Sequence, residues 1–207
     1  MAKKYYSYYD YPSWKNHQKR LWDYREQVNP ENEAWWSVNY DTFKNDLGDL
    51  LKEFEEAGIY VQQIIYIAFR STQMDNMDPS DPSSIYIHVD SKDDEEHLQK
   101  QQDVTTFTPE YVFNIPLKNC KSSETLFFEF IDPTDPNRNL GQHAWGGGCV
   151  DYNNIYEADR FKLDRPAFLK IDGPHAVHNP TQEPRIVASI RIHKDSPALQ
   201  EMVAING

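Results

Sequence analysis

Apolar residues recur at helical spacing in one early part of the chain, with lysines and acidic residues between them. The pattern predicts a helix that begins after the cap Asp41-Thr42 and ends near Gly58. A residue every three or four positions places the apolar side chains on one helical face. The positions that form this face are Phe43, Leu47, Leu50, Leu51 and Phe54.

Short runs rich in β-branched and aromatic residues follow this helix, and each run is bounded by residues typical of turns. Runs of this kind predict strands. One helix followed by many short strands indicates a mostly-β barrel or sandwich with supporting helices. The predicted strands are residues 59–69, 85–90, 111–117 (closed by Pro116), 125–131, 167–171 and 185–192.

Polar segments separate the predicted strands. Residues 71–84 predict a loop, and residues 91–103 predict a solvated loop or a short surface helix. Residues 132–160 form a long insertion with Asp-Pro pairs and a Gly-Gly-Gly run, which favours a functional lid, with disorder as the alternative. Residues 195–207 are interpreted as a short tail.

The first 40 residues are unusually rich in tyrosine and tryptophan. We interpret them as an irregular arm whose rings pack on the main body, with a substrate-binding flap as the alternative. A chain of 207 residues fits one domain with a decorated end. The expected division is therefore an aromatic arm over residues 1–40 and a β domain over residues 41–207.

The formal net charge of −12 changes the range of expected partners. Binding to phosphates requires clustered lysine and arginine, so nucleic acid is not an expected partner. The same balance argues against an anionic membrane surface. No apolar run approaches the roughly 18 residues of a membrane span.

The N-terminal sequence and the spacing of the cysteines favour a cytoplasmic protein. The N-terminus has a basic start and no apolar segment of a secretory signal. The two cysteines, Cys120 and Cys149, are not in a C-x-x-C pair, which argues against a disulfide framework or a zinc-thiolate site. A reducing cytoplasm is the expected compartment.

The predicted strand 85–90 ends in the sequence His88-Val89-Asp90. Residues i and i+2 of a strand face the same side, so the imidazole and the carboxylate project together. A second histidine from elsewhere, His175, would complete a two-histidine, one-carboxylate set that suits Fe(II) and its oxygen chemistry. Zinc hydrolysis also fits these ligands. H-x-D alone is a weak motif in a chain with seven histidines, because a single histidine on an apolar strand is usually a core residue.

Polar side chains on the last predicted strand form a second part of the candidate site. Arg185, Val187, Ser189 and Arg191 alternate with apolar residues and share one face. Arginine offers a planar fork for a carboxylate, and a buried arginine needs an anion. An acidic small molecule is therefore a plausible ligand. The alternative is a pair of structural salt bridges to aspartate or glutamate.

Four blocks of this sequence, taken together, resemble a known family. In order and spacing they are similar to small 2-oxoglutarate- and Fe(II)-dependent oxygenases of the aspartyl/asparaginyl β-hydroxylase-like and prolyl-hydroxylase-like group, many of them from marine phages and bacteria. The resemblance covers residues of about 85 to 192. The blocks are Tyr86 to Ser91, Phe113 to Cys120, Gly173 to Asn179 and Pro184 to Arg191.

The resemblance implies a double-stranded β-helix, a cupin-like jelly-roll barrel, and a dioxygenase that uses O2 and 2-oxoglutarate to hydroxylate an unactivated C–H bond. The substrate would be a peptide side chain, an amino acid or a small metabolite. The resemblance implies His88, Asp90 and His175 as iron ligands, with His178 as a rival to His175. It implies Arg185 as the anchor of the 2-oxoglutarate C5 carboxylate, with Arg191 as the alternative anchor.

Three further residues are candidates to line the co-substrate pocket, and a glycine-rich segment is a candidate lid. The pocket candidates are Tyr86, Asn114 and Ser189, and the lid candidates are Trp145 and Gly146 to Gly148. Two other functions remain open. One is a cupin-like module that binds a metal or a small acid without turnover, and the other is a structural or phage accessory protein with its histidines in the core.

Overall fold

The structure is a computed structural model. It describes residues 5–29, 34–38, 40–74, 76, 84–90, 107–134, 139–142 and 148–206. The predicted segment 91–103 and the lid candidates Trp145, Gly146 and Gly147 lie outside the described residues. None of the described helices combines the length and the apolar character needed to cross a membrane.

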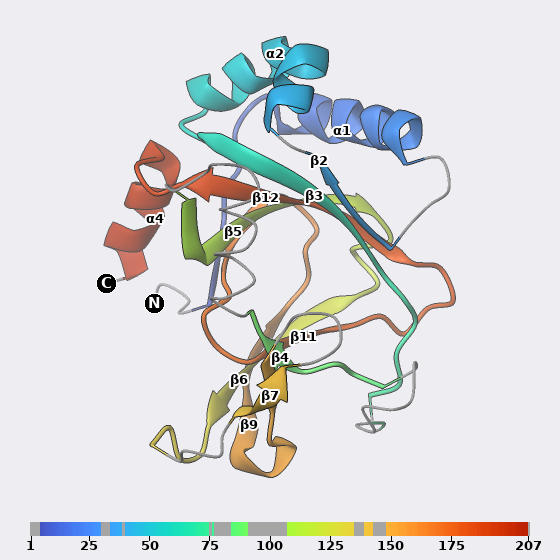
Figure 1. The fold of residues 1–207 in the computed structure, drawn as a ribbon, viewed down its shortest axis with the longest axis vertical. Coiled ribbons are helices and arrows are strands. Elements are labelled where there is room, and N and C mark those ends of the chain that lie inside the picture. The colour runs from blue at the N-terminus through green and yellow to red at the C-terminus, as the bar shows by residue number, and fades with distance from the viewer. Residues whose placement is uncertain are drawn as a thin grey trace.

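The strands of the described residues form two six-stranded antiparallel sheets (Figure 1). The first sheet has the order β1-β10-β5-β12-β3-β2 and the second the order β7-β8-β4-β11-β6-β9. The strands of the first sheet are β1 (Tyr6–Tyr8), β2 (Trp35–Val38), β3 (Val61–Phe69), β5 (Phe107–Lys118), β10 (Ala167–Lys170) and β12 (Arg185–His193). Those of the second are β4 (His88–Val89), β6 (Glu124–Phe130), β7 (Asn139–Gln142), β8 (Gly148–Val150), β9 (Ile155–Phe161) and β11 (His175–His178).

The chain passes back and forth between the two sheets. From β3 to β6, and again from β10 to β12, each strand pairs in the sheet opposite to that of the strand before it. This mostly-β, antiparallel arrangement with few helices is consistent with a β-sandwich or jelly-roll-like fold. The prediction of a mostly-β fold with supporting helices is therefore confirmed.

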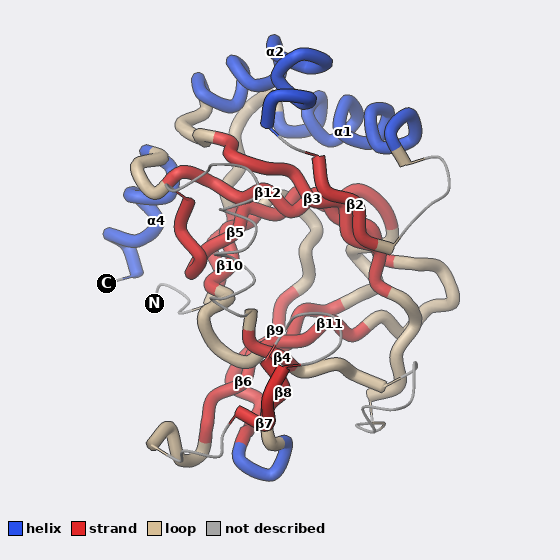
Figure 2. The backbone as a smooth tube through the Cα atoms, in the orientation of Figure 1, coloured by secondary structure: helices blue, strands red, loops and turns tan. Residues whose placement is uncertain are grey.

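The first sheet carries a different layer on each face. The helices α1 (Trp14–Val28) and α2 (Tyr40–Glu56) pack on the face that points away from the second sheet (Figure 2), and α4 (Pro197–Asn206) contributes to the same core. Ile64, Tyr66, Phe113 and Ile190 belong to this helix-side core. The opposite face contacts the second sheet, and its core includes Val112, Leu169 and Val187 together with Phe127 and Phe161 from the second sheet.

The N-terminal aromatic segment is built into the first sheet. Its rings pack on the body as the first interpretation expects, with Tyr6, Tyr11 and Tyr24 buried. The expectation of an irregular arm was wrong, because the segment contains β1, α1 and β2. Helix α1 buries His17, Leu21, Tyr24 and Arg25, and two of these four are polar or charged, so the apolar period of the helix is hidden in the sequence.

Three other expectations need correction. Strand β5 is longer than predicted and continues through Pro116, which lies at a register shift against β12, where a proline is tolerated. Residues 132–160 contain strands β7, β8 and part of β9, and the largely exposed residues of β9 give little apolar signal. The tail is helix α4, whose first-turn Pro197 is a start signal that the reading of the sequence missed.

Candidate metal centre

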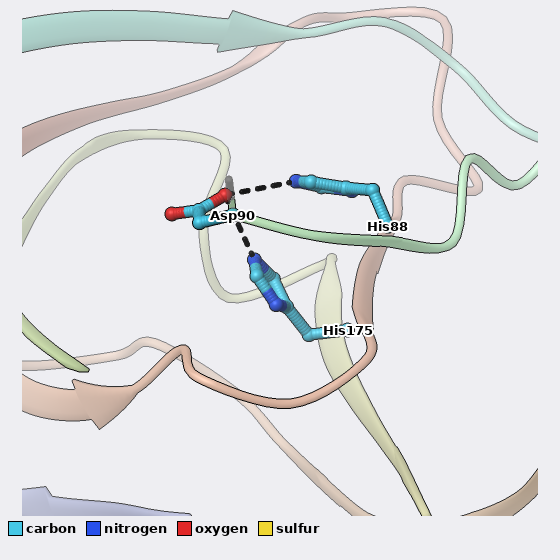
Figure 3. Close-up of side chains that lie close together, drawn as sticks. All are labelled: His88, Asp90 and His175. Carbon is cyan, nitrogen blue, oxygen red and sulfur yellow. Dashed lines mark ion pairs between the residues drawn. The ribbon is translucent and has the colours of Figure 1, made fainter. Parts of the chain in front are cut away.

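Strand pairing in the second sheet brings two histidines together. In the register, His175 of β11 lies opposite His88 of β4 on one side and opposite Phe127 of β6 on the other. Directly paired residues of antiparallel strands point to the same face, which here faces the first sheet. Asp90 follows His88 by two positions and projects to the same side (Figure 3).

The three side chains converge on one point. Asp90 Oδ1 lies 3.4 Å from His88 Nε2 and 3.8 Å from His175 Nε2. One donor atom from each residue lies within 4.8 Å of the other two. Two imidazole nitrogens and a carboxylate oxygen at these separations can contact a single divalent cation.

Backbone carbonyls orient both imidazoles. His88 Nδ1 lies 3.3 Å from the carbonyl of Tyr86, and His175 Nδ1 lies 3.0 Å from the carbonyl of Gly173. A carbonyl accepts a hydrogen bond, so these contacts turn Nδ1 of each ring toward the backbone and Nε2 of each ring toward Asp90. Contacts of this kind support metal-ligating histidines by fixing the tautomer and the ring orientation.

The electrostatics of the group favour an ionised carboxylate beside a neutral imidazole. Burial opposes the charge of Asp90, but the hydrogen bond from His88 and the nearby His175, His88 and Arg191 outweigh it and hold the pKa of Asp90 below its usual range. Burial and the neighbouring His88 lower the pKa of His175 to about 4, although Asp90 acts in the opposite direction. A neutral histidine and an ionised aspartate are the forms that bind metals.

The two arginines of β12 have different surroundings, although both are buried on the inner face. Arg191 Nη2 lies 3.8 Å from Asp90 Oδ2. Arg185 forms no ion pair with any carboxylate of the described residues. Both of its terminal nitrogens donate to Thr125 Oγ1 at 3.0 Å, and its guanidinium lies 5.4 Å from the centre of the Phe69 ring.

Unsatisfied polar atoms accompany Arg185 on this face. Within the described residues, neither Arg185 Nε nor Asn114 Oδ1 has a hydrogen-bond partner, and both atoms are buried. Asn114 of β5 lies directly opposite Ser189 of β12. Buried polar atoms are normally paired, so these two are the groups that a polar ligand would satisfy.

Of the other predicted site residues, Tyr86 lies beside the metal cluster and His178 does not. The ring of Tyr86 stacks on the His88 imidazole, with centroids 4.7 Å apart. His178, the rival ligand, is not in the cluster, since it lies three positions after His175 and its Nδ1 is 3.0 Å from Thr72 Oγ1. Thr125 is a partner of Arg185 that the sequence reading missed, because a single threonine within an apolar strand gives no signal.

Comparisons with known proteins leave the chain without an established family. No protein-family model matches it, and no curated protein matches it. A prolyl-4-hydroxylase from Pseudomonas putida is 7% identical with a TM-score of 0.42, over 93% of this chain and 94% of that one. An L-ribose isomerase from Cellulomonas parahominis, solved with L-psicose, is 11% identical with a TM-score of 0.30, over 90% and 85%. At TM-scores this low, neither likeness establishes a shared fold.

Proposed function

We propose that this protein is a dioxygenase that uses Fe(II) and 2-oxoglutarate to hydroxylate an unactivated C–H bond. The observation that carries the proposal is the His88, Asp90 and His175 cluster, whose donor atoms lie within 4.8 Å of one another. The buried Arg185 on the facing sheet supports the part of the proposal that concerns the co-substrate. The substrate would be a peptide side chain, an amino acid or a small metabolite, and the compartment would be the cytoplasm.

The proposal includes a double-stranded β-helix as the scaffold. Its eight strands would be β3, β12, β5 and β10 in one sheet and β4, β11, β6 and β9 in the other. The adjacency of these strands in each sheet and the repeated crossing between sheets support this assignment. In such a scaffold, the metal ligands and the anchoring arginine lie on the inner faces of opposite sheets.

The donor set fits Fe(II). Two imidazoles and one carboxylate form a facial set that leaves room for further ligands. When bound, Fe(II) supplies the activation of O2 that couples decarboxylation of 2-oxoglutarate to hydroxylation of a C–H bond. Zinc hydrolysis would fit the same ligands but gives no role to the buried Arg185.

The chain itself performs three tasks in this scheme. Asp90 and His175 are held in metal-binding protonation states by their surroundings. Arg185, seated on Thr125, would receive the distal carboxylate of 2-oxoglutarate, which would also satisfy its Nε. The surrounding apolar side chains, including Val187 and Phe127, would exclude water from the reacting atoms.

An anaerobic Fe(II) titration followed by a succinate assay tests the proposal. The wild-type protein should bind Fe(II) and form succinate from 2-oxoglutarate, whereas His88→Ala or Asp90→Ala should abolish Fe(II) binding. His178→Ala is the matched control and should bind Fe(II) normally. Binding without succinate would instead support a cupin-like binding module, and absence of metal binding would support a structural protein.

The anchor is tested separately. Arg185→Ala should weaken 2-oxoglutarate binding by about a hundredfold, because a buried charged hydrogen-bond partner is lost, while Fe(II) affinity changes little. Calorimetry with the Mn(II)-loaded protein measures the affinity for 2-oxoglutarate, and the anaerobic titration of the metal-free protein measures the affinity for Fe(II). If Arg191→Ala has this effect and Arg185→Ala does not, the anchor is Arg191.

A further inference from the structure

A hollow of about 530 Å³ lies between helix α1 and the first sheet, on the face of the sheet that carries the helices. Its floor is a row of residues on three neighbouring strands. Ile186 of β12 is paired with Ala68 of β3 on one side and with Lys118 of β5 on the other. Directly paired residues of antiparallel strands point to the same face. Ile186 alternates with Ala188 of the helix-side core, so this row faces α1.

Two cationic side chains stand at this end of the sheet. Lys118 reaches the helix side through a β-bulge, because the pairing shifts from Ile186 with Lys118 to Val187 with Pro116 and leaves an extra residue on β5. Arg70 follows Ala68 by two positions, just after the end of β3, and lines the same hollow. The two cations therefore come from strands on opposite sides of β12.

Neither of these cations is neutralised within the described part of the chain. The side chains of Arg70 and Lys118 are exposed and form no ion pair or hydrogen bond with the described residues. A third cation, Arg25 of α1, lies 2.7 Å from the carboxylate of Glu26, which is the one acidic residue among the described residues that line the hollow. The hollow thus has an excess of positive charge in a chain with a formal charge of −12.

The rest of the hollow is apolar. Trp22 precedes Arg25 by three positions and shares its side of α1, and the Arg25 guanidinium lies 5.4 Å from the centre of the Trp22 ring. Arg25 is 1% exposed, so it forms a fixed support beside the indole. Pro184 and Ile186 complete the apolar lining from the side of β12. Such walls accommodate an apolar or aromatic group next to the two cations.

We infer that this hollow binds a small phosphate monoester with an apolar or aromatic body. A phosphate monoester carries a charge of about −2 at neutral pH, which matches two cations, whereas a carboxylate carries only one negative charge. Lys118 and Ala68 stand two strand spacings apart, roughly 10 Å, so a phosphate above Ile186 is within reach of both long cationic side chains. The body of the ligand lies against Trp22.

The site is separate from the metal centre. Ile186 and Arg185 are neighbours on β12 and point to opposite faces, so the phosphate lies behind the strand that carries the proposed co-substrate anchor. Binding in the hollow requires no metal. The inference therefore goes beyond the proposed function and does not depend on it.

Calorimetry on the metal-free, full-length protein tests the inference with phenyl phosphate, benzoate and inorganic phosphate. Phenyl phosphate should bind about tenfold more tightly than benzoate, which has the same ring and a single negative charge. It should also bind about tenfold more tightly than inorganic phosphate, which has no ring to bury against Trp22. Trp22→Leu should reduce the second ratio and leave the affinity for inorganic phosphate unchanged.

Matched variants assign the effect to the hollow. Arg70→Gln and Lys118→Gln should each weaken phenyl phosphate by about tenfold, because each removes a charged hydrogen-bond donor from an exposed position that the fold does not need. Lys121→Gln removes the same charge three residues after Lys118, outside this hollow, and should retain the affinity. Arg185→Ala should also retain it, which separates the hollow from the position of the co-substrate.

Three results would overturn the inference: no binding of phenyl phosphate, equal affinities for phenyl phosphate and benzoate, or a loss of affinity in Lys121→Gln as large as in Arg70→Gln. Failure of the proposed function is recognised separately. In that case the protein binds no Fe(II) or forms no succinate, whereas every measurement on the hollow is made without metal.

Discussion

The two faces of β12 are equally buried and chemically opposite. The face toward the helices presents Ile190 and Ile192 to an apolar core. The face toward the second sheet presents Arg185, Ser189 and Arg191, each at most 5% exposed. One strand thus contributes apolar packing on one side and two buried guanidinium groups on the other.

The apolar face of β12 stabilises the fold, whereas its polar face positions side chains of the candidate site. Burial of apolar side chains is favourable without a partner, whereas a buried charge is costly unless it is paired. Arg191 has Asp90 nearby, but Arg185 has only uncharged side-chain partners among the described residues, the hydroxyl of Thr125 and the thiol of Cys120. The buried arginines on the face toward the second sheet therefore cost stability, whereas the apolar side chains on the face toward the helices do not.

The largest expected effect is on the helix side. Ile190→Ala should lower the free energy of unfolding by about 3 kcal/mol, because it opens a cavity in a fully buried core. Chemical denaturation measures the loss. Metal affinity, measured under conditions where the variant is folded, should stay unchanged, and a large loss of metal affinity would show that the two faces are not independent.

Acidification should lower the free energy of unfolding through His175 and Asp90 on the inner face of the second sheet. The pKa of His175 is about 4 in the folded protein and near 6.5 in the unfolded chain, so its contribution to stability is complete above pH 6.5 and is lost as the pH falls toward 4. The low pKa of Asp90 adds a loss of the same sign at still lower pH. For the metal-free protein, the His175 contribution is on the order of 3 kcal/mol. In the His175→Gln variant, the free energy of unfolding should depend less on pH between 6.5 and 4 than in the wild type. An unchanged slope would contradict this.

Removing the buried charge at Arg185 should have the opposite sign from the isoleucine variant. Arg185→Met keeps much of the side-chain volume and removes a charge that lacks an ionic partner among the described residues, so the free energy of unfolding should rise by about 1 kcal/mol. The same variant should lose 2-oxoglutarate binding. Thermal and chemical unfolding without co-substrate provide the measurement, and a clear destabilisation would mean that Arg185 is a structural residue.

An effect of similar size and opposite sign is expected where the ends of α2 and α4 meet. Gly58 has φ +74° at the end of α2, and a Cβ there would lie 3.2 Å from the backbone nitrogen of Ala198 at the start of α4. Gly58→Ala should therefore destabilise the protein by about 1 kcal/mol. Gly48→Ala, where a Cβ meets no atom within 4 Å, is the control and should be neutral or stabilising.

The sequence was informative where one physical requirement dominated. The helix at residues 40–56 and strands such as β3 and β12 have apolar periods that packing requires, and they were predicted closely. The alternation in β12 also predicted which of its side chains share a face. The association of His88 with His175 came from the spacing of motifs and a family resemblance, since no local pattern specifies which strands become neighbours.

The missed features depend on tertiary contacts. Helix α1 buries His17, whose Nε2 lies 2.9 Å from Glu53 of α2, and a residue of that type is not recognised as a core position in a sequence. Strand β9 is an edge strand whose exposed residues alternate weakly. Thr125 acquires its role from Arg185, a partner that lies 60 positions away.

The two short strands β1 and β2 stand at opposite borders of the first sheet, where they pair with β10 and β3. The described residues 5–29 and 34–38 therefore supply both edge strands of this sheet. A protein shortened to begin at residue 41 would leave the backbone groups of β10 and β3 open to strands from other molecules, which is a common origin of aggregation. Expression of the β domain alone should for this reason yield insoluble material, and added synthetic arm peptide should restore solubility.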